Sequence, residues 1–172
     1  MQHVTTPEVC RLTGLSTQKL REWTSRRSLV PADVPSMRQG SPAKFTWATV
    51  LILRLAVVLR EQFCVDLQAN QAFLAELRKE LGRRSFLSLR GQSLALLGRE
   101  RWVLLDRGEV PPTDALVIYL DPHLEVLSAG FSMQELPSGA PQRDLFPLSG
   151  LPTPVANARV KTRKIAGQRR GI

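Results

Sequence analysis

The chain has 172 residues, 43% of them hydrophobic, and its 24 Lys and Arg against 15 Asp and Glu give a formal net charge of +9. That hydrophobic content excludes a wholly disordered chain, and the length allows one domain or two small ones. The excess of basic residues favours a polyanionic partner. Two cysteines cannot make a disulfide framework, so we expect a protein of the reducing cytoplasm.

Charge divides the chain into three parts. Residues 1–83 carry 12 Lys and Arg against 7 acids, residues 84–144 carry 6 against 8, and residues 145–172 carry 6 against none. We therefore expect an α+β protein with a helical N-terminal domain over residues 1–83 and a small β-rich domain over residues 84–144. A proline-containing linker and a basic, disordered tail are expected over residues 145–172.

The first 31 residues predict two short helices separated by a tight turn. Thr6 is the expected N-cap of the first helix, and Gly14 ends it because glycine adopts left-handed backbone without a Cβ clash. Ser16 can then cap a second, basic helix over residues 17–27, in which Trp23 belongs to the core. A capped helix, a glycine turn and a basic helix predict a helix-turn-helix, whose second helix usually enters the major groove of DNA.

Four short motifs carry a family resemblance: residues 9–16 (VCRLTGLS), 20–23 (LREW), 29–31 (LVP) and 44–46 (KFT). Together they resemble the MerR (mercury-resistance regulator) superfamily of winged helix-turn-helix proteins. The resemblance covers roughly residues 4–82, and Arg27 and Ser28 stand where that family usually has a glycine. It implies a four-helix domain with a wing, specific binding to double-stranded DNA and a homodimer.

The basic side chains of the second helix and the following loop are the predicted DNA contacts. Residues 29–30 are expected to form a short strand that leads into a proline-containing wing over residues 32–43. Position 21 matches the arginine that contacts phosphate in relatives, and the amide of Gln18 suits the edge of adenine. An ordinary solvated face is the alternative. The predicted set is Thr17, Gln18, Lys19, Arg21, Arg26, Arg27, Arg38 and Lys44.

Two longer helices should follow. Thr46 is the expected cap of a helix over residues 47–62, which is apolar on nearly all sides at residues 50–59. Such a helix must be covered on more than one side, so a second domain or a second subunit is expected against it. A fourth helix is predicted over residues 66–81, with a leucine stripe and with Gly82 at its end.

The pattern changes to short apolar runs after residue 85. The predicted strands are residues 86–89, 94–97, 102–105, 115–120 and 124–127, with the first two forming a hairpin around Gly91. Residues 94–97 and 124–129 could be helical instead. Residues 157–172 are polar and basic, and the sequence leaves open whether they track phosphates or are only solvated.

Catalytic, metal and membrane motifs find little support. His3 and His123 belong to no recognisable triad or paired-carboxylate motif, so we expect no enzyme activity and no cofactor. Cys10 falls at a small core position, and Cys64 is expected to be a half-buried packing residue, which disfavours a metal site. The apolar run at residues 50–59 is far shorter than the ~20 residues that span a bilayer.

The sequence therefore predicts a cytoplasmic, sequence-specific transcriptional regulator that binds double-stranded DNA as a homodimer. The third helix, the leucine stripe and the C-terminal sheet are the candidate dimer surfaces, and the C-terminal domain could instead dock a protein partner. One alternative is a DNA-architectural, excisionase-like recombination accessory protein that binds repeated sites. The other is a protein-binding adaptor in which the DNA-binding part is secondary.

Overall fold

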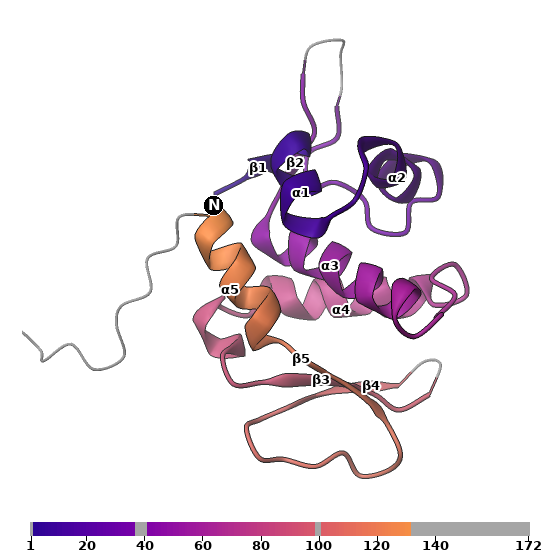
Figure 1. Ribbon diagram of the computed structural model, residues 1–172, viewed down its shortest axis with the longest axis vertical. Coiled ribbons are helices and arrows are strands. Elements are labelled where there is room, and N and C mark those ends of the chain that lie inside the picture. Colours follow the sequence, from indigo (N-terminus) through magenta and orange to yellow (C-terminus); the bar gives the residue numbers. More distant parts are fainter. Residues whose placement is uncertain (1, 37–40, 99–100, 132–172) are drawn as a thin grey trace, which may run out of the picture. The chain divides into compact units, whose positions relative to one another are not determined.

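The computed structural model describes residues 2–36, 41–98 and 101–131, all of which belong to one unit, Met1–Glu135 (Figure 1). This part of the chain is mixed α and β, as predicted, with five α-helices and two small antiparallel sheets. The predicted linker and basic tail over residues 145–172 lie outside the described residues.

Helix α1 (Thr6–Thr13) begins one residue earlier than predicted. Its N-cap is Thr5, because Glu8 lies three residues later and completes a capping box in which Thr5 N–H donates to Glu8 Oε2 at 2.9 Å. Gly14 ends the helix at φ +77°, and its N–H donates to Cys10 O at 2.9 Å. The predicted glycine turn is therefore confirmed.

The next helix is α2 (Thr17–Arg21), which continues directly into a π-helical turn, η1 (Glu22–Arg26). Ser16 caps it as predicted, since its hydroxyl accepts from Lys19 N–H at 3.2 Å. Trp23 is 1% exposed and belongs to the core, also as predicted.

The strand predicted at residues 29–30 is wrong. The N–H groups of Leu29 and Val30 both donate to Trp23 O, at 2.8 and 3.3 Å, so they close the end of η1 and pair with no strand. Both side chains are buried, which explains their strand-like apolar character.

A two-stranded sheet connects the N-terminus to the start of the third helix. Strand β1 (Val4–Thr5) pairs antiparallel with β2 (Lys44–Phe45). The segment between η1 and β2 is named the 31–43 loop, of which residues 31–36 and 41–43 are described, and an isolated bridge joins Val34 to Lys44 at its base.

Helix α3 (Trp47–Glu61) forms the centre of the described unit. Thr46 caps it, as predicted, and ten of its 15 residues are buried. Helices α1, α4 and α5 all pack on it (Figure 1). Its apolar sides are thus covered by elements of the same unit, and this helix does not require a second subunit.

Arg54 is the charged residue within the apolar run of α3. Its Nη1 donates to Leu12 O, near the C-terminal end of α1, where the helix dipole favours a cation. Burial lowers the pKa of Arg54 below its usual value. This hydrogen bond joins α3 to the turn that leads into α2.

Helix α4 (Gln71–Arg83) begins five residues later than predicted. Residues 66–70 form turns instead, because the carboxylate of Asp66 accepts from Gln68 N–H at 2.9 Å and Asp66 O accepts from the Asn70 side chain at 2.7 Å. Gly82 lies within the helix and does not end it. The predicted leucine stripe is buried against the chain's own core: Leu67, Leu74, Leu77 and Leu81 are each 1% exposed.

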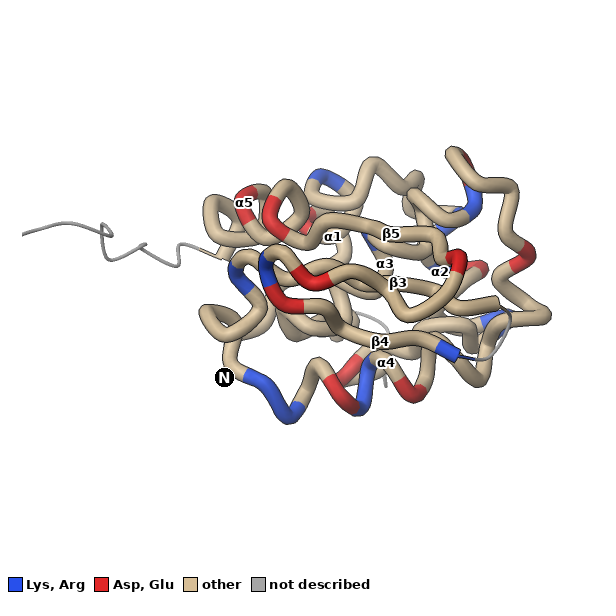
Figure 2. The backbone as a smooth tube through the Cα atoms, turned by 90° about the horizontal axis from the view of Figure 1, so that it is seen from below, with Lys and Arg blue, Asp and Glu red and all other residues tan. Residues whose placement is uncertain are grey.

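The second sheet has three strands, β3 (Ser93–Leu96), β4 (Trp102–Leu105) and β5 (Leu116–Tyr119), in the antiparallel order β4-β3-β5 (Figure 2). The strands predicted at these three places are confirmed. The strand predicted at residues 86–89 is wrong, since a 3₁₀ turn, η2 (Leu87–Leu89), lies there. The hairpin therefore joins β3 to β4, and does not turn around Gly91.

Helix α5 (Asp121–Gly130) replaces the strand predicted at residues 124–127, and the helical alternative is correct. Its buried side chains recur at helical spacing, which explains the outcome: Leu120, Leu124, Leu127 and Phe131 are each at most 1% exposed. None of the helices in the described ranges has the length and apolar character needed to cross a bilayer.

His123 on α5 should make stability depend on pH. Burial, and secondarily the charge of Arg54, lower the pKa of His123 below its usual 6.5. The unfolded chain therefore binds this proton first, so stability is unaffected above about pH 6.5 and falls as the pH drops below it. Urea unfolding between pH 7.5 and 5 should show this loss, and His123→Gln should reduce it. His3→Gln, at an exposed position, is the control, and equal pH profiles for parent and His123→Gln would contradict the prediction.

Candidate nucleic-acid interface

A groove of about 940 Å³ separates α2 and η1 from the 31–43 loop. Its helical wall includes Thr17, Arg21, Thr24 and Arg26, and its loop wall includes Ser36 and Ser41. Among the described residues that line it there is no Asp or Glu. The described lining thus combines two cationic and several hydroxyl side chains with apolar residues such as Leu20 and Phe45, and it includes no carboxylate.

Two of the predicted DNA contacts, Arg21 and Arg26, lie in this groove. Both are exposed, and within the described part of the chain neither side chain makes a hydrogen bond or an ion pair. Because no carboxylate neutralises them, both guanidinium groups can accept an anionic ligand with bidentate geometry.

Lys19 and Arg27 are placed differently, because both contact Glu22. Lys19 Nζ lies 3.0 Å from Glu22 Oε2, and Arg27 Nε lies 2.8 Å from Glu22 Oε1. The hydrogen bond from Lys19, opposed by slight desolvation and supported by the charge of Arg27, lowers the pKa of Glu22. Glu22 therefore partly neutralises both cations, so they attract an anionic ligand less strongly than Arg21 and Arg26 do.

The remaining predicted contacts are distributed around the groove. Thr17 lies in its wall, whereas Gln18 is exposed beside it on the first turn of α2. Lys44 is exposed on β2, where its backbone pairs with Val34 at the base of the 31–43 loop. Arg38 lies outside the described residues.

Apart from the predicted Thr17, the hydroxyl residues of the groove escaped the sequence interpretation, among them Thr24, Ser36 and Ser41. Thr24 follows Thr17 and Arg21 at helical spacing, so periodicity could have placed it on the same face. Ser36 and Ser41 come from opposite sides of the loop, and Ser36 Oγ donates to Ser41 O at 2.7 Å. No local pattern in the sequence indicates that these two serines meet.

Helix α4 contacts both walls of the groove, one through a hydrogen bond and the other through an ion pair. Gln71 Nε2 donates to Ser28 O at 3.0 Å, just after η1. Arg78 Nη2 lies 2.8 Å from Asp33 Oδ1 in the 31–43 loop, and Asp33 Oδ2 accepts from Thr46 N–H at 2.6 Å. The position of the loop relative to α2 therefore depends on α4.

Asp33→Asn should destabilise the fold, because it removes the charge that Arg78 pairs with. Partial burial raises the pKa of Asp33, but the hydrogen bonds from Thr46 N–H and Arg78 lower it more, so the net pKa lies below its usual value. The variant should lose about 2 kcal/mol of unfolding free energy at pH 7. Because the folded pKa is depressed, the parent should lose this contribution as the pH falls through that pKa, and the variant should not.

Urea unfolding of Asp33→Asn, Arg78→Ala and the double variant would measure the pair. A coupling energy near zero in this cycle would contradict a stabilising contact between the two side chains.

The two cysteines are free thiols at separate places. Cys10 is partly buried on α1, and its Sγ lies 3.8 Å from Thr17 Oγ1. Cys64 is exposed, with φ +53°, in the connection between α3 and α4, so the prediction of a half-buried packing residue is wrong. The backbone at this tight connection directs the side chain to solvent.

The chemistry of the groove suits phosphate oxygens. Guanidinium groups are frequent contacts of the DNA backbone, and an exposed helix beside them can reach base edges. The hydroxyls of Thr24 and Ser36 donate to Leu20 O and Ser41 O, so they offer a ligand their acceptor lone pairs unless they rotate. A comparison of the chain with models of known protein families finds no match, and a search of curated proteins finds no relative either.

Proposed function

We propose that the chain is a cytoplasmic, sequence-specific regulator of transcription that binds double-stranded DNA through a MerR-like winged helix-turn-helix. In this proposal α1, the Gly14 turn and α2 form the helix-turn-helix, and the 31–43 loop is the wing. The groove between α2 and that loop is the observation that carries the proposal, because its described lining has no Asp or Glu and its Arg21 and Arg26 have no partner among the described residues.

The groove defines how duplex DNA would be bound. The first turn of α2, with Thr17 and Gln18, would enter the major groove and meet base edges, as second helices of this motif do. Arg21 and Arg26 would contact phosphates that border the major groove. The loop would lie over the adjacent backbone, and Lys44 at its base would add charge there.

A homodimer belongs to this proposal, because a single module of this size buries little DNA surface. Most apolar side chains of α3 and the whole leucine stripe are buried within the chain. The outer face of the second sheet remains as the candidate surface. Val117 and Tyr119 alternate with the core residue Ile118 on β5, and Tyr119 is 70% exposed.

The loop after β4 differs from the groove in charge. It carries both signs, with Asp106, Arg107 and Glu109 following the strand (Figure 2). Such a mixed surface gives no electrostatic attraction for DNA, which leaves this side available to a protein contact, with a second copy or another partner.

Selection of bound genomic fragments, followed by footprinting, would test the function. One palindromic site with two-fold related protection supports a dimeric regulator. Tandem repeats on bent DNA would support an excisionase-like accessory protein instead. Affinity no greater for selected than for random fragments would contradict both and favour the adaptor hypothesis.

Gln18→Ala should change which sites are preferred more than it changes overall affinity. A good bidentate base contact is worth about 1–3 kcal/mol of discrimination, so the preference at one base pair should relax by that amount. Competition binding on a library with each position of the site varied would measure it. Gln62→Ala, at an exposed position after α3, is the matched control, and an unchanged preference in Gln18→Ala would remove this residue from the base contacts.

A further inference from the structure

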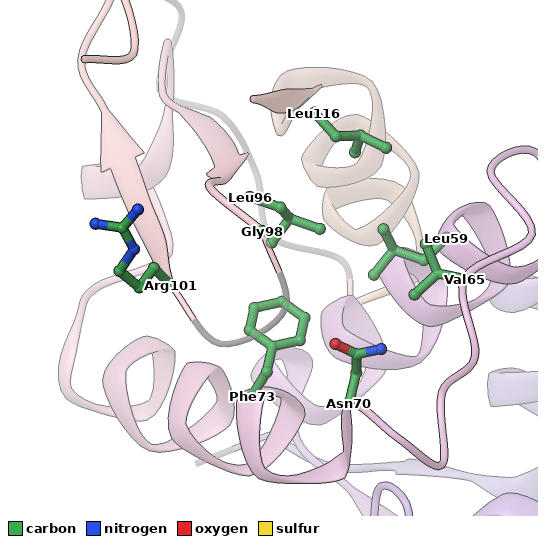
Figure 3. Close-up of a pocket in the computed structure, with 8 residues that line it drawn as sticks. All are labelled: Leu59, Val65, Asn70, Phe73, Leu96, Gly98, Arg101 and Leu116. Carbon is green, nitrogen blue, oxygen red and sulfur yellow. The ribbon is translucent and has the colours of Figure 1, made fainter. Parts of the chain in front are cut away.

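A second hollow lies between the ends of α3 and α4 and the second sheet (Figure 3). Its volume is about 250 Å³. Apolar side chains from five places in the chain form its walls: Leu59, Val65, Phe73, Leu96 and Leu116. Apolar cavities of about 150 Å³ are already large enough to bind benzene, so this space can hold a small organic molecule.

Asn70 supplies the polar group of the hollow. Its Nδ2 donates to Asp66 O at 2.7 Å, which leaves its Oδ1 as an acceptor without a partner among the described residues. Figure 3 shows the amide pointing into the space between Phe73 and Val65, whereas the guanidinium of Arg101 points away from it. Among the described residues the site therefore offers apolar walls and one neutral acceptor, and its one charged lining residue, Arg101, directs its guanidinium away from the space.

We propose that this hollow binds a small, uncharged, largely apolar molecule that carries one hydrogen-bond donor, and that α4 transmits its occupancy to the DNA-facing groove. An ion would lose its hydration here without gaining a charged partner among the described side chains that face the space, so a neutral ligand is favoured. A planar aromatic ring with one N–H or O–H matches both the ring of Phe73 and the acceptor Asn70 Oδ1.

The transmission follows from what α4 contacts. Asn70 and Phe73 line the hollow, and Gln71 between them donates to Ser28 O at the end of η1. Two turns further along, Arg78 holds Asp33 in the 31–43 loop. A ligand that shifts the first turns of α4 therefore moves contacts to both walls of the groove. This second step rests on the proposed DNA-binding function, whereas binding in the hollow does not.

Indole is a suitable probe, because it is flat, apolar and has one N–H donor. Titrated into the ¹⁵N-labelled full-length chain, it should give saturable shifts of backbone amides around residues 59–73, 96 and 116. 1-Methylindole lacks the donor and should bind about fivefold more weakly, the equivalent of one neutral hydrogen bond. Leu116→Phe, which fills the hollow, should weaken indole binding about tenfold or more.

Leu87→Phe is the matched control, because Leu87 is 62% exposed on η2, away from the hollow. A thermal unfolding midpoint at or above that of the parent would show that Leu116→Phe is folded, and Val65→Phe is the second filling variant if it is not. Absence of saturable shifts at the hollow, or equal indole affinity in a folded filling variant and the parent, overturns the binding site.

The coupling is tested on the selected DNA fragment. Saturating indole should change the Kd for that fragment by about threefold or more in the parent and in Leu87→Phe, and should have no effect in Leu116→Phe. A parent Kd that stays within about twofold overturns the coupling. If the parent prefers no DNA sequence, the proposed function and the coupling fall together, while the indole titration still decides on the hollow.

Discussion

Arg21→Ala should weaken binding to every duplex DNA, selected and random alike, by about tenfold or more. The guanidinium of Arg21 lines the groove, is exposed and has no partner among the described residues, so nothing within the fold competes for it. A charge-assisted hydrogen bond to phosphate is worth about 1.5–3 kcal/mol, which corresponds to roughly ten- to hundredfold in affinity. Since a phosphate contact reads no base, the loss should be uniform across sequences.

The salt dependence of binding gives a second readout of the same variant. Loss of one phosphate contact should reduce the slope of log K against log salt by about 1. Arg83→Ala is the matched control, because Arg83 is exposed on α4 and does not line the groove. If Arg21→Ala binds the selected site as tightly as Arg83→Ala does, α2 is not the DNA-binding helix.

Local backbone chemistry made the turn at Gly14 and the caps of α2 and α3 predictable. A side-chain hydroxyl accepts from the unpaired N–H groups of a helix's first turn only when its residue is the N-cap. This requirement identifies Ser16 and Thr46 as the N-caps of α2 and α3. Gly14 adopts a left-handed conformation that other residues avoid. These signals lie within three or four residues of the structure they determine, so they need no knowledge of distant contacts.

Helix α5 could not be predicted from local signals in the same way. The run at residues 124–127 taken alone is compatible with a strand and with a helix. The helical spacing emerges only with Leu120 and Phe131 included, and packing against α1 and α3 buries that face. At Gly130 an added Cβ would lie 2.8 Å from Leu12 Cδ1, so α5 approaches α1 closely at a residue without a side chain. Nothing near Gly130 in the sequence indicates that its neighbour lies more than a hundred residues earlier.

The candidate site, too, was only partly predictable from local sequence. The set of basic residues could be read from the sequence, but not which of them are free. Lys19 and Glu22 have the spacing of a helical ion pair, whereas Arg27 reaches Glu22 because η1 is a π-helical turn, in which Arg27 N–H donates to Glu22 O at 2.8 Å. A change of helix type thus separates Arg27, which is paired with Glu22, from Arg26, which has no partner among the described residues.

Leu55→Ala should be the most destabilising of the substitutions considered, lowering the free energy of unfolding by about 3 kcal/mol. Leu55 is 0% exposed on α3, the helix on which α1, α4 and α5 all pack. Truncation of a buried leucine removes its transfer energy and leaves a cavity that close neighbours fill only in part, and measured losses are about 2–5 kcal/mol. Val57→Ala, at a partly buried position of the same helix, should lose about 1 kcal/mol or less.

Urea unfolding followed by circular dichroism would compare the two variants at pH 7.5, where His123 is neutral in both the folded and the unfolded chain. The difference between them measures how completely α3 is enclosed by its own chain. A loss for Leu55→Ala no larger than that for Val57→Ala would mean that this face of α3 is open in solution.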